Sequence, residues 1–159
     1  MGDKTLIYKQ KVLANLDGSY KHLSRLNSAF LELEKKYAFP VQKNDFEEII
    51  NNIQTLAYSD QCIYRFSKLQ DCLGAKLFKS VLLYQGENVN KPFLDLLNQL
   101  ESIDILDVDE WFEIRDLRNE IAHDYDSDDT TVLNVLNTIH KLKDELENIL
   151  NAINALAVR

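Results

Sequence analysis

Glycine and proline are scarce in this sequence, and their scarcity constrains the fold more than any other feature. Only 4 of the 159 residues are glycine and 2 are proline, so the chain holds few of the residues that end helices and form tight turns. Between them, apolar residues recur at three- and four-residue spacing, the period of an amphipathic helix. No strand-like alternation or internal repeat is visible. The pattern predicts an all-α protein and argues against a nucleotide-binding α/β sheet.

The first half of the chain predicts two long helical regions. One runs from about Thr5 to Ala38 and is ended by Pro40, because proline disfavours a helix. Asn44 or Asp45 is the expected cap of the second region, and the sequence leaves open whether Ser59-Asp60 interrupts it. The stripes that should face the core are Leu13, Leu16, Tyr20, Leu23, Phe30 and Tyr37 in the first region, and Phe46, Ile49, Ile50, Ile53 and Leu56 in the second.

The second half predicts one short helix and two more main helices. Pro92 suits the first position of the short helix, and Asp107 or Asp109 can cap the next one. Residues 126–129 form a loop and cap before a final long helix. Gly74, inside the preceding helical run, predicts close packing against a neighbouring helix. The whole chain, residues 1–159, is therefore expected to be a single domain, an antiparallel bundle of four main helices plus one short helix.

Composition limits where in the cell the chain is expected and which partners it is expected to bind. No apolar stretch approaches the length that spans a membrane, and the N-terminus lacks the apolar region of a secretory signal. Cys62 and Cys72 form neither a metal nor a disulfide pattern and are expected to be buried thiols, so a cytoplasmic location is predicted. The net charge of −8 argues against a surface that grips nucleic acid along its length. Any contact with RNA must be local.

One segment near the end of the fourth predicted helix combines residues that could perform chemistry. Arg118 and Tyr125 are seven residues apart and return to nearly the same face of a helix. His123 would lie about 140° away from Arg118 on a continuous helix, so the two converge only if the helix ends near His123 or if a second copy contributes. A histidine can transfer protons near neutral pH, and a guanidinium can hold a phosphate through two hydrogen bonds. RNA supplies its own 2′-hydroxyl nucleophile, so no metal is required.

The sequence "WFEIRDLRNEIAHDYD" carries Arg118, Asn119, His123 and Tyr125 in the R-x4-H-x-Y arrangement. It resembles the signature of HepT-like toxins of the HEPN superfamily. The segments "RFSKLQDCLGAKLF" and "FLDLLNQLESIDIL" are also similar to that family, and the chain resembles nucleotidyltransferase substrate-binding subunits as well. The resemblance covers residues 61–126, whereas residues 1–60 are similar mainly in being helical.

The resemblance implies a function as well as a fold. It implies a homodimer in which two copies of the motif face one cleft and cleave RNA as a metal-independent endoribonuclease without a cofactor. Arg118 would contact phosphate, Asn119 would orient the site and His123 would be the acid or base. The implied partner is a minimal nucleotidyltransferase antitoxin that attaches AMP to Tyr125, which would block phosphate binding beside Arg118 by charge and by volume.

Simpler interpretations of the same residues stay open. Arg118 has acidic neighbours on its own helix and could be an ion-paired surface residue, and His123 could be a cation favoured at a helix C-terminus. Tyr125 could pack as an amphipathic lid. A different function is also open, that of a non-catalytic subunit which binds substrate or nucleotide for a nucleotidyltransferase. A purely structural interaction module is the third hypothesis.

Overall fold

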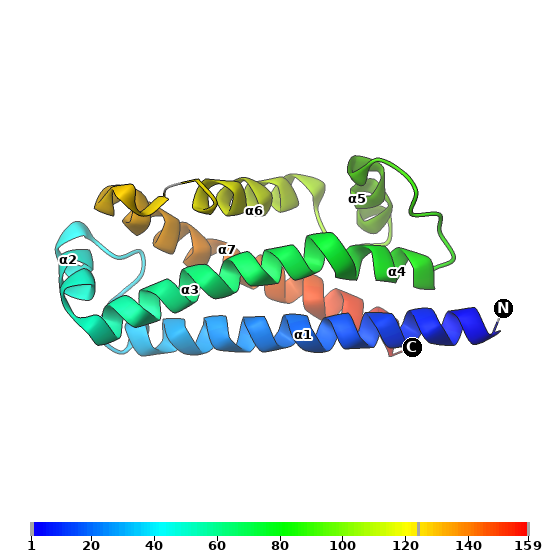
Figure 1. Ribbon diagram of the computed structural model, residues 1–159, viewed down its shortest axis with the longest axis horizontal. Coiled ribbons are helices and arrows are strands. Elements are labelled where there is room, and N and C mark those ends of the chain that lie inside the picture. Colours follow the sequence, from blue (N-terminus) through cyan, green and yellow to red (C-terminus); the bar gives the residue numbers. More distant parts are fainter. Residues whose placement is uncertain (1, 124, 159) are drawn as a thin grey trace.

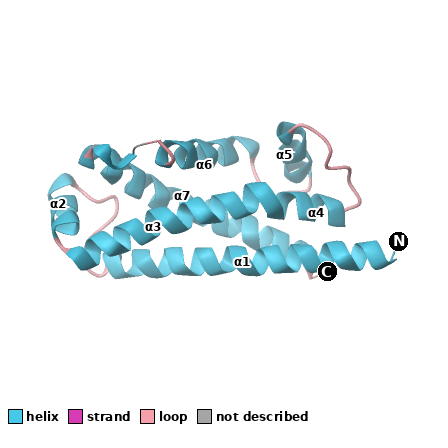
Figure 2. Cartoon of the chain, viewed as in Figure 1, coloured by secondary structure: helices cyan, strands magenta, loops and turns pink. Residues whose placement is uncertain are grey.

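Helices are the only regular secondary structure in the residues that the computed structural model of the protein describes, 2–123 and 125–158 (Figures 1 and 2). The elements are α1 (Gly2–Glu34), α2 (Lys43–Asn51), α3 (Ile53–Cys72), the π-helical segment η1 (Leu73–Leu77), α4 (Phe78–Tyr84), α5 (Phe93–Ser102), α6 (Val108–Ile121), the 3-10 turn η2 (Tyr125–Ser127) and α7 (Asp129–Ala157). Because α3, η1 and α4 follow one another without a break, they count as one long helix. Residues 2–123 and 125–158 then form six helices. The predicted all-α bundle is confirmed, with one more short helix than expected.

The helices enclose one continuous apolar core. Figure 1 shows α3 lying between α1 and α6, with α7 behind them, and α3 packs against all three. Fully buried apolar side chains come from each of the helices α1 to α7 and from η1, so every helix contributes to the core. They include Phe30, Leu33, Ile49, Phe66, Leu69, Leu77, Phe78, Leu96 and Trp111. Within residues 2–123 and 125–158, no helix is both long and apolar enough to cross a membrane.

The second predicted region is interrupted, but not at Ser59-Asp60. The break lies at Asn52, whose extended backbone separates α2 from α3 and whose side chain accepts hydrogen bonds from the backbone N–H groups of Gln54 and Thr55. This is an N-cap, which satisfies amides that the first turn of a helix leaves free. The predicted caps Asn44 and Asp45 lie inside α2, because that helix already begins at Lys43.

The predicted end of the first helix and parts of the predicted core faces are also wrong. α1 stops at Glu34, well before Pro40, and its last turn closes through the Tyr37 N–H bond to the Leu33 carbonyl. Leu13 is 40% exposed, and Ile53, at the start of α3, is 83% exposed. Leu16, Leu23 and Phe30 are buried as predicted, but Val12 and Ser19 are buried in place of their neighbours Leu13 and Tyr20. The buried stripe of α1 consists of Val12, Leu16, Ser19, Leu23, Leu26, Phe30 and Leu33.

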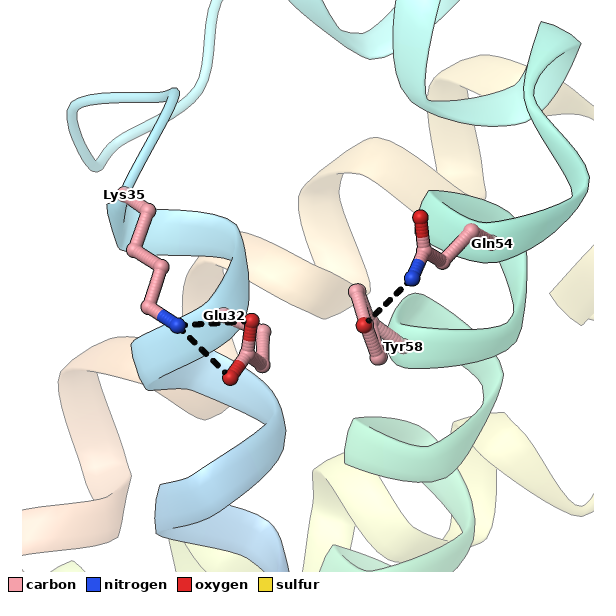
Figure 3. Close-up of polar contacts among 4 residues, drawn as sticks. All are labelled: Glu32, Lys35, Gln54 and Tyr58. Atoms are coloured by element: carbon pink, nitrogen blue, oxygen red, sulfur yellow. Dashed lines mark hydrogen bonds and ion pairs between the residues drawn. The ribbon is translucent and has the colours of Figure 1, made fainter.

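Two short-range polar contacts lie at the C-terminal end of α1 and in the first turns of α3 (Figure 3). Lys35 bonds both carboxylate oxygens of Glu32, at 2.9 and 3.0 Å, and the Gln54 amide donates to the Tyr58 hydroxyl at 3.0 Å. Each contact joins positions three or four residues apart, the spacing at which side chains meet on a helix. The charge of Lys35 is therefore neutralised by Glu32 of α1.

Gly74 confirms the predicted close packing between helices. It lies in the π-helical segment η1, and a Cβ atom placed on it would be 3.3 Å from Cζ2 of Trp111. A π-helical turn carries one extra residue and widens the helix locally. The missing side chain at Gly74 thus allows the indole of Trp111, which is fully buried and also contacts Phe78 edge-on, to fix α6 against α3.

The two cysteines do not form a disulfide. Cys62 is fully buried, and burial raises the pKa of its thiol far above the usual range. Cys72 is only partly buried. The expected buried thiol is therefore found at Cys62 and only in part at Cys72.

Candidate functional site

Arg118 is held in place by a carboxylate from another helix. Its Nε and Nη2 atoms donate to Oδ1 and Oδ2 of Asp71 at 3.0 and 3.1 Å. Arg118 projects from the last turn of α6 and Asp71 from the last turn of α3, so the pair bridges the two helices. A bidentate pair of this kind fixes the plane and direction of the guanidinium as well as its position.

The pair leaves part of the guanidinium available. A guanidinium has five N–H donors. Asp71 takes one from Nε and one from Nη2, and Nη1 has no hydrogen-bond partner among residues 2–123 and 125–158. The side chain of Arg118 is 27% exposed and that of Asp71 is 44% exposed, which means that solvent reaches both. Arg118 is therefore ion-paired, as the simpler interpretation expected, but its partner is on α3 and not among its acidic neighbours on α6.

His123 lies beyond the end of α6. The helix ends at Ile121, and the His123 N–H bonds the Glu120 carbonyl at 3.1 Å in a turn that closes the helix. This ending meets one condition that the sequence set, a helix that ends near His123. Within the described residues, however, no hydrogen bond or ion pair joins the side chains of His123 and Arg118. Its side chain is exposed. Asp124, a predicted neighbour of the site, lies outside the described residues.

Tyr125 lies in η2 and is partly buried against the core and α7. Burial raises the pKa of its phenol, and the negative charges of Asp60 on α3 and Asp126 raise it further. The phenol thus stays protonated at neutral pH. Its partly buried ring fits the interpretation as a lid, whereas AMP attachment at this residue stays a prediction.

Asn119 is exposed on α6 beside the Arg118 face. Its side chain makes no hydrogen bond within the described part of the chain, so the structure gives no support for an orienting role within one copy.

A shallow cavity of about 330 Å³ adjoins the Arg118–Asp71 pair. Asp71 forms part of its wall, together with Gln70, Gly74, Ala75, Phe93 and Arg115. Gln70 is 92% buried, since only 8% of it is exposed, and its amide makes no hydrogen bond in the described part of the chain. The Trp111 indole N–H, packed behind Gly74, is likewise buried without a partner. The cavity therefore offers an amide and a cation next to Arg118.

Sequence reasoning missed Asp71, although it lies in the segment "RFSKLQDCLGAKLF" that resembles the family. Its pairing with Arg118 joins residues 47 positions apart, and no local spacing rule connects them. The only signal was a carboxylate on a predicted neighbouring helix. The described residues contain no group of three or more His, Cys, Asp or Glu side chains placed to hold a metal ion.

No family model matches the chain, and neither a curated protein nor a solved structure matches it. The resemblance to HepT-like HEPN proteins therefore stays a prediction.

Proposed function

We propose that the protein is a metal-independent endoribonuclease toxin that acts as a homodimer, with Arg118 and His123 of both copies in one cleft. The observation that carries the proposal is the Arg118–Asp71 pair. Asp71 orients the guanidinium and leaves Nη1 without a partner in the described part of the chain, while α6 ends at Ile121, two residues before His123. This arrangement supplies an oriented cation for a phosphate and an exposed proton carrier on the same helix end.

The proposed reaction uses the RNA's own hydroxyl group. A histidine removes the proton of the 2′-OH, the oxygen attacks the adjacent phosphorus, and the P–O5′ bond breaks. The products are a 2′,3′-cyclic phosphate and a 5′-hydroxyl, whose oxygen takes a proton from a second acid. Arg118 stabilises the charge that builds on the phosphoryl oxygens in the transition state.

The dimer follows from the chemistry. The reaction needs one base and one acid, and the motif contains one histidine. Two copies related by a twofold axis would supply His123 twice, one copy acting on the 2′-oxygen and the other on the 5′-oxygen. A twofold interface brings the same surface patch of both copies together, so a motif at the end of α6 would meet its own copy.

The proposed partner is a minimal nucleotidyltransferase antitoxin that transfers AMP to Tyr125. The phenol oxygen would attack the α-phosphorus of ATP, releasing pyrophosphate, and its proton must leave. Because burial and two carboxylates raise the pKa of Tyr125, the antitoxin would have to supply the base. The added phosphate would then bring negative charge close to the end of α6.

The proposal is tested by RNA cleavage with the purified chain in EDTA. Arg118→Ala and His123→Ala should each abolish cleavage, and circular dichroism should show both variants folded. Lys43→Ala, which removes an exposed cation at the start of α2, is the control and should cleave as the parent does. Products ending in a 2′,3′-cyclic phosphate identify the mechanism. A dimeric parent that cleaves no RNA, or two motif variants that stay active, would refute the proposal.

One observation favours a second function, that of a non-catalytic subunit which binds a nucleotide for a nucleotidyltransferase. The charge of Arg118 is already neutralised by Asp71, and the whole chain has a net charge of −8. A site that only binds a nucleotide depends less on positive charge than a site that stabilises a charged transition state. Growth of cells that express the chain alone separates the two functions. A toxin should arrest growth unless Arg118 is replaced, whereas a binding subunit should leave growth unchanged.

A further inference from the structure

Five cationic or titratable side chains gather where α1 and α3 meet. They are Lys21, His22 and Arg25 of α1 and Arg65 and Lys68 of α3, and we call them the α1–α3 cation cluster. Their proximity affects the pKa of His22. Burial is the main cause that lowers this pKa, and the positive charges of Arg65, Arg25, Lys68 and Lys21 lower it further. Every charge that shifts this histidine is positive. In a protein with a net charge of −8, this is a marked local excess of positive charge.

Within the cluster, the cations stay unneutralised. Arg65 Nη1 lies 3.0 Å from His22 Nδ1, and because a guanidinium can only donate, the histidine nitrogen accepts this bond and the ring stays neutral. Arg65 Nε is buried without a hydrogen-bond partner in the described part of the chain. Across residues 2–123 and 125–158, none of the four Lys and Arg side chains forms an ion pair. Lys35, at the far end of α1, is by contrast bonded to Glu32 (Figure 3).

Tyr64 provides an aromatic surface inside the cluster. It is 50% exposed, and its ring centroid lies 5.1 Å from Arg65 Cζ and 5.6 Å from Lys68 Nζ. Cations near an aromatic ring fix its position and favour contact with a further π-system. A half-exposed ring among phosphate-binding side chains is the usual platform for an unpaired base of a single strand.

The cluster and the Arg118 site share one strip of α3. Tyr64 and Asp71 are seven residues apart, so they lie two turns apart on nearly one face, separated by about 10 Å along the axis. Lys68 lies between them, and Asp71 is the residue that holds Arg118. Figure 1 shows α3 between α1 and α6, so the strip joins the cations of α1 to the arginine of α6.

We propose that the α1–α3 cation cluster and Tyr64 bind the backbone and one base of a single-stranded RNA whose reacting phosphate lies at Arg118. The proposal rests on the proposed function for the identity of the nucleic acid and for the place of the reacting phosphate. It also answers the difficulty that the acidic composition raised, because the RNA contact is local and lies at a cluster of four Lys and Arg side chains.

The experiment measures binding without cleavage. A short fluorescent 2′-O-methyl oligonucleotide lacks the nucleophilic hydroxyl, so fluorescence anisotropy reports its affinity for the full-length chain whether or not the protein is a ribonuclease. Arg25→Ala/Lys68→Ala should weaken binding about tenfold or more and reduce the slope of log affinity against log salt by about 1.4, since each single-strand phosphate contact contributes about 0.7. Tyr64→Ala should weaken binding about fivefold or more by removing the base stack.

The control double variant is Lys35→Ala/Lys141→Ala, which removes the same net charge outside the cluster and should leave the affinity and the salt slope close to those of the parent. Equal losses in both double variants would show that net charge alone governs binding and would overturn the proposal. So would a parent that binds anionic phospholipid vesicles but not the oligonucleotide. Loss of binding in the cluster variants supports the proposal even if the parent cleaves no RNA, so a failure of the ribonuclease assignment remains distinguishable.

Discussion

The two faces of α6 carry opposite chemistry. Toward α3, Trp111 is buried against Gly74 and Arg118 is bonded to Asp71. On the other side, a groove of about 330 Å³ against α7 has three carboxylates in its wall and a single cation. The residues of that groove are Glu113, Asp116, Leu117, Glu120, Thr138, Lys141 and Leu142. One helix therefore separates a cation-bearing face from an acidic one.

The separation shows why the net charge of −8 is a poor guide to what this chain can bind. The charge that RNA meets is that of one face, within a screening length of about 8–10 Å. Glu113 and Glu120 line the groove against α7, whereas the α1–α3 cation cluster lies where α1 and α3 meet. We expect perturbations on the two sides of α6 to differ in kind, with large effects toward α3 and small ones toward α7.

The largest expected effect is on stability. Trp111→Ala should lower the free energy of unfolding by about 3–5 kcal/mol, because it removes a fully buried indole and leaves a cavity between α3 and α6. Glu113→Ala, on the opposite face, should change it by no more than about 0.5 kcal/mol. Urea unfolding followed by circular dichroism measures both. Similar losses in the two variants would mean that α6 is anchored equally on both sides.

The next effect is on activity. Asp71→Asn keeps the shape of the side chain but loses the charge that orients Arg118, and under the proposed function it should slow RNA cleavage by about tenfold to a hundredfold. Stability should fall by less than about 1 kcal/mol, since both side chains of the pair are partly exposed. Asp116→Asn is the matched control on the α7 side, and it should cleave at the parental rate. A fully active Asp71→Asn would remove the positioning role of this carboxylate.

How much of this site the sequence could predict depends on how far apart along the chain the interacting residues lie. The fold class, the cap at Asp107 and the packing of Gly74 against a helix followed from local pattern, and all three are confirmed. The end of α6 near His123 was stated as a condition for the chemistry, and the helix does end two residues earlier. These features depend on one helix or on the composition of one turn.

What the sequence could not predict depends on tertiary contacts. The Arg118–Asp71 pair and the α1–α3 cation cluster join residues more than 40 positions apart. Their pairing follows from how α1, α3 and α6 pack and not from any spacing along the chain. The misplaced Leu13 and Ile53 have a related cause, because both fit the helical period near the edge of an apolar stripe. Only packing decides which side of that edge is covered.

Two glycines test the packing on the α3 side more finely. Gly74→Ala places a Cβ atom 3.3 Å from the rigid, buried indole of Trp111, whereas a Cβ atom at Gly18 in α1 would meet nothing within 4 Å. Alanine favours a helix over glycine by about 1 kcal/mol, so Gly18→Ala should stabilise the protein by about that amount. At Gly74, crowding costs about 1–3 kcal/mol, and the net result should be a loss of about 1 kcal/mol. Urea unfolding should give opposite signs, and equal gains would show that Trp111 can move aside.

The smallest expected effect lies on the side of α6 that faces α7, where Glu110 shares a hydrogen bond with Glu145. This bond, reinforced by burial and by neighbouring carboxylates, raises the pKa of Glu110 to about 7. A carboxyl group whose pKa is higher in the folded state stabilises the fold below its unfolded pKa of about 4.5, and this stabilisation is lost as the pH rises through about 7. Because Glu110 is exposed and solvent screens its charge, we expect the loss to be about 0.5 kcal/mol or less.

Urea unfolding at pH about 5 and about 8 measures this difference, and Glu110→Gln should remove it, since glutamine can donate to Glu145 without titrating. Glu120→Gln, near the other end of α6, is the control and should retain the parental pH dependence. If Glu110→Gln retained it as well, the shared proton between α6 and α7 would not exist. The acidic side of α6 would then be an ordinary solvated surface, and its contrast with the α3 side would rest on charge alone.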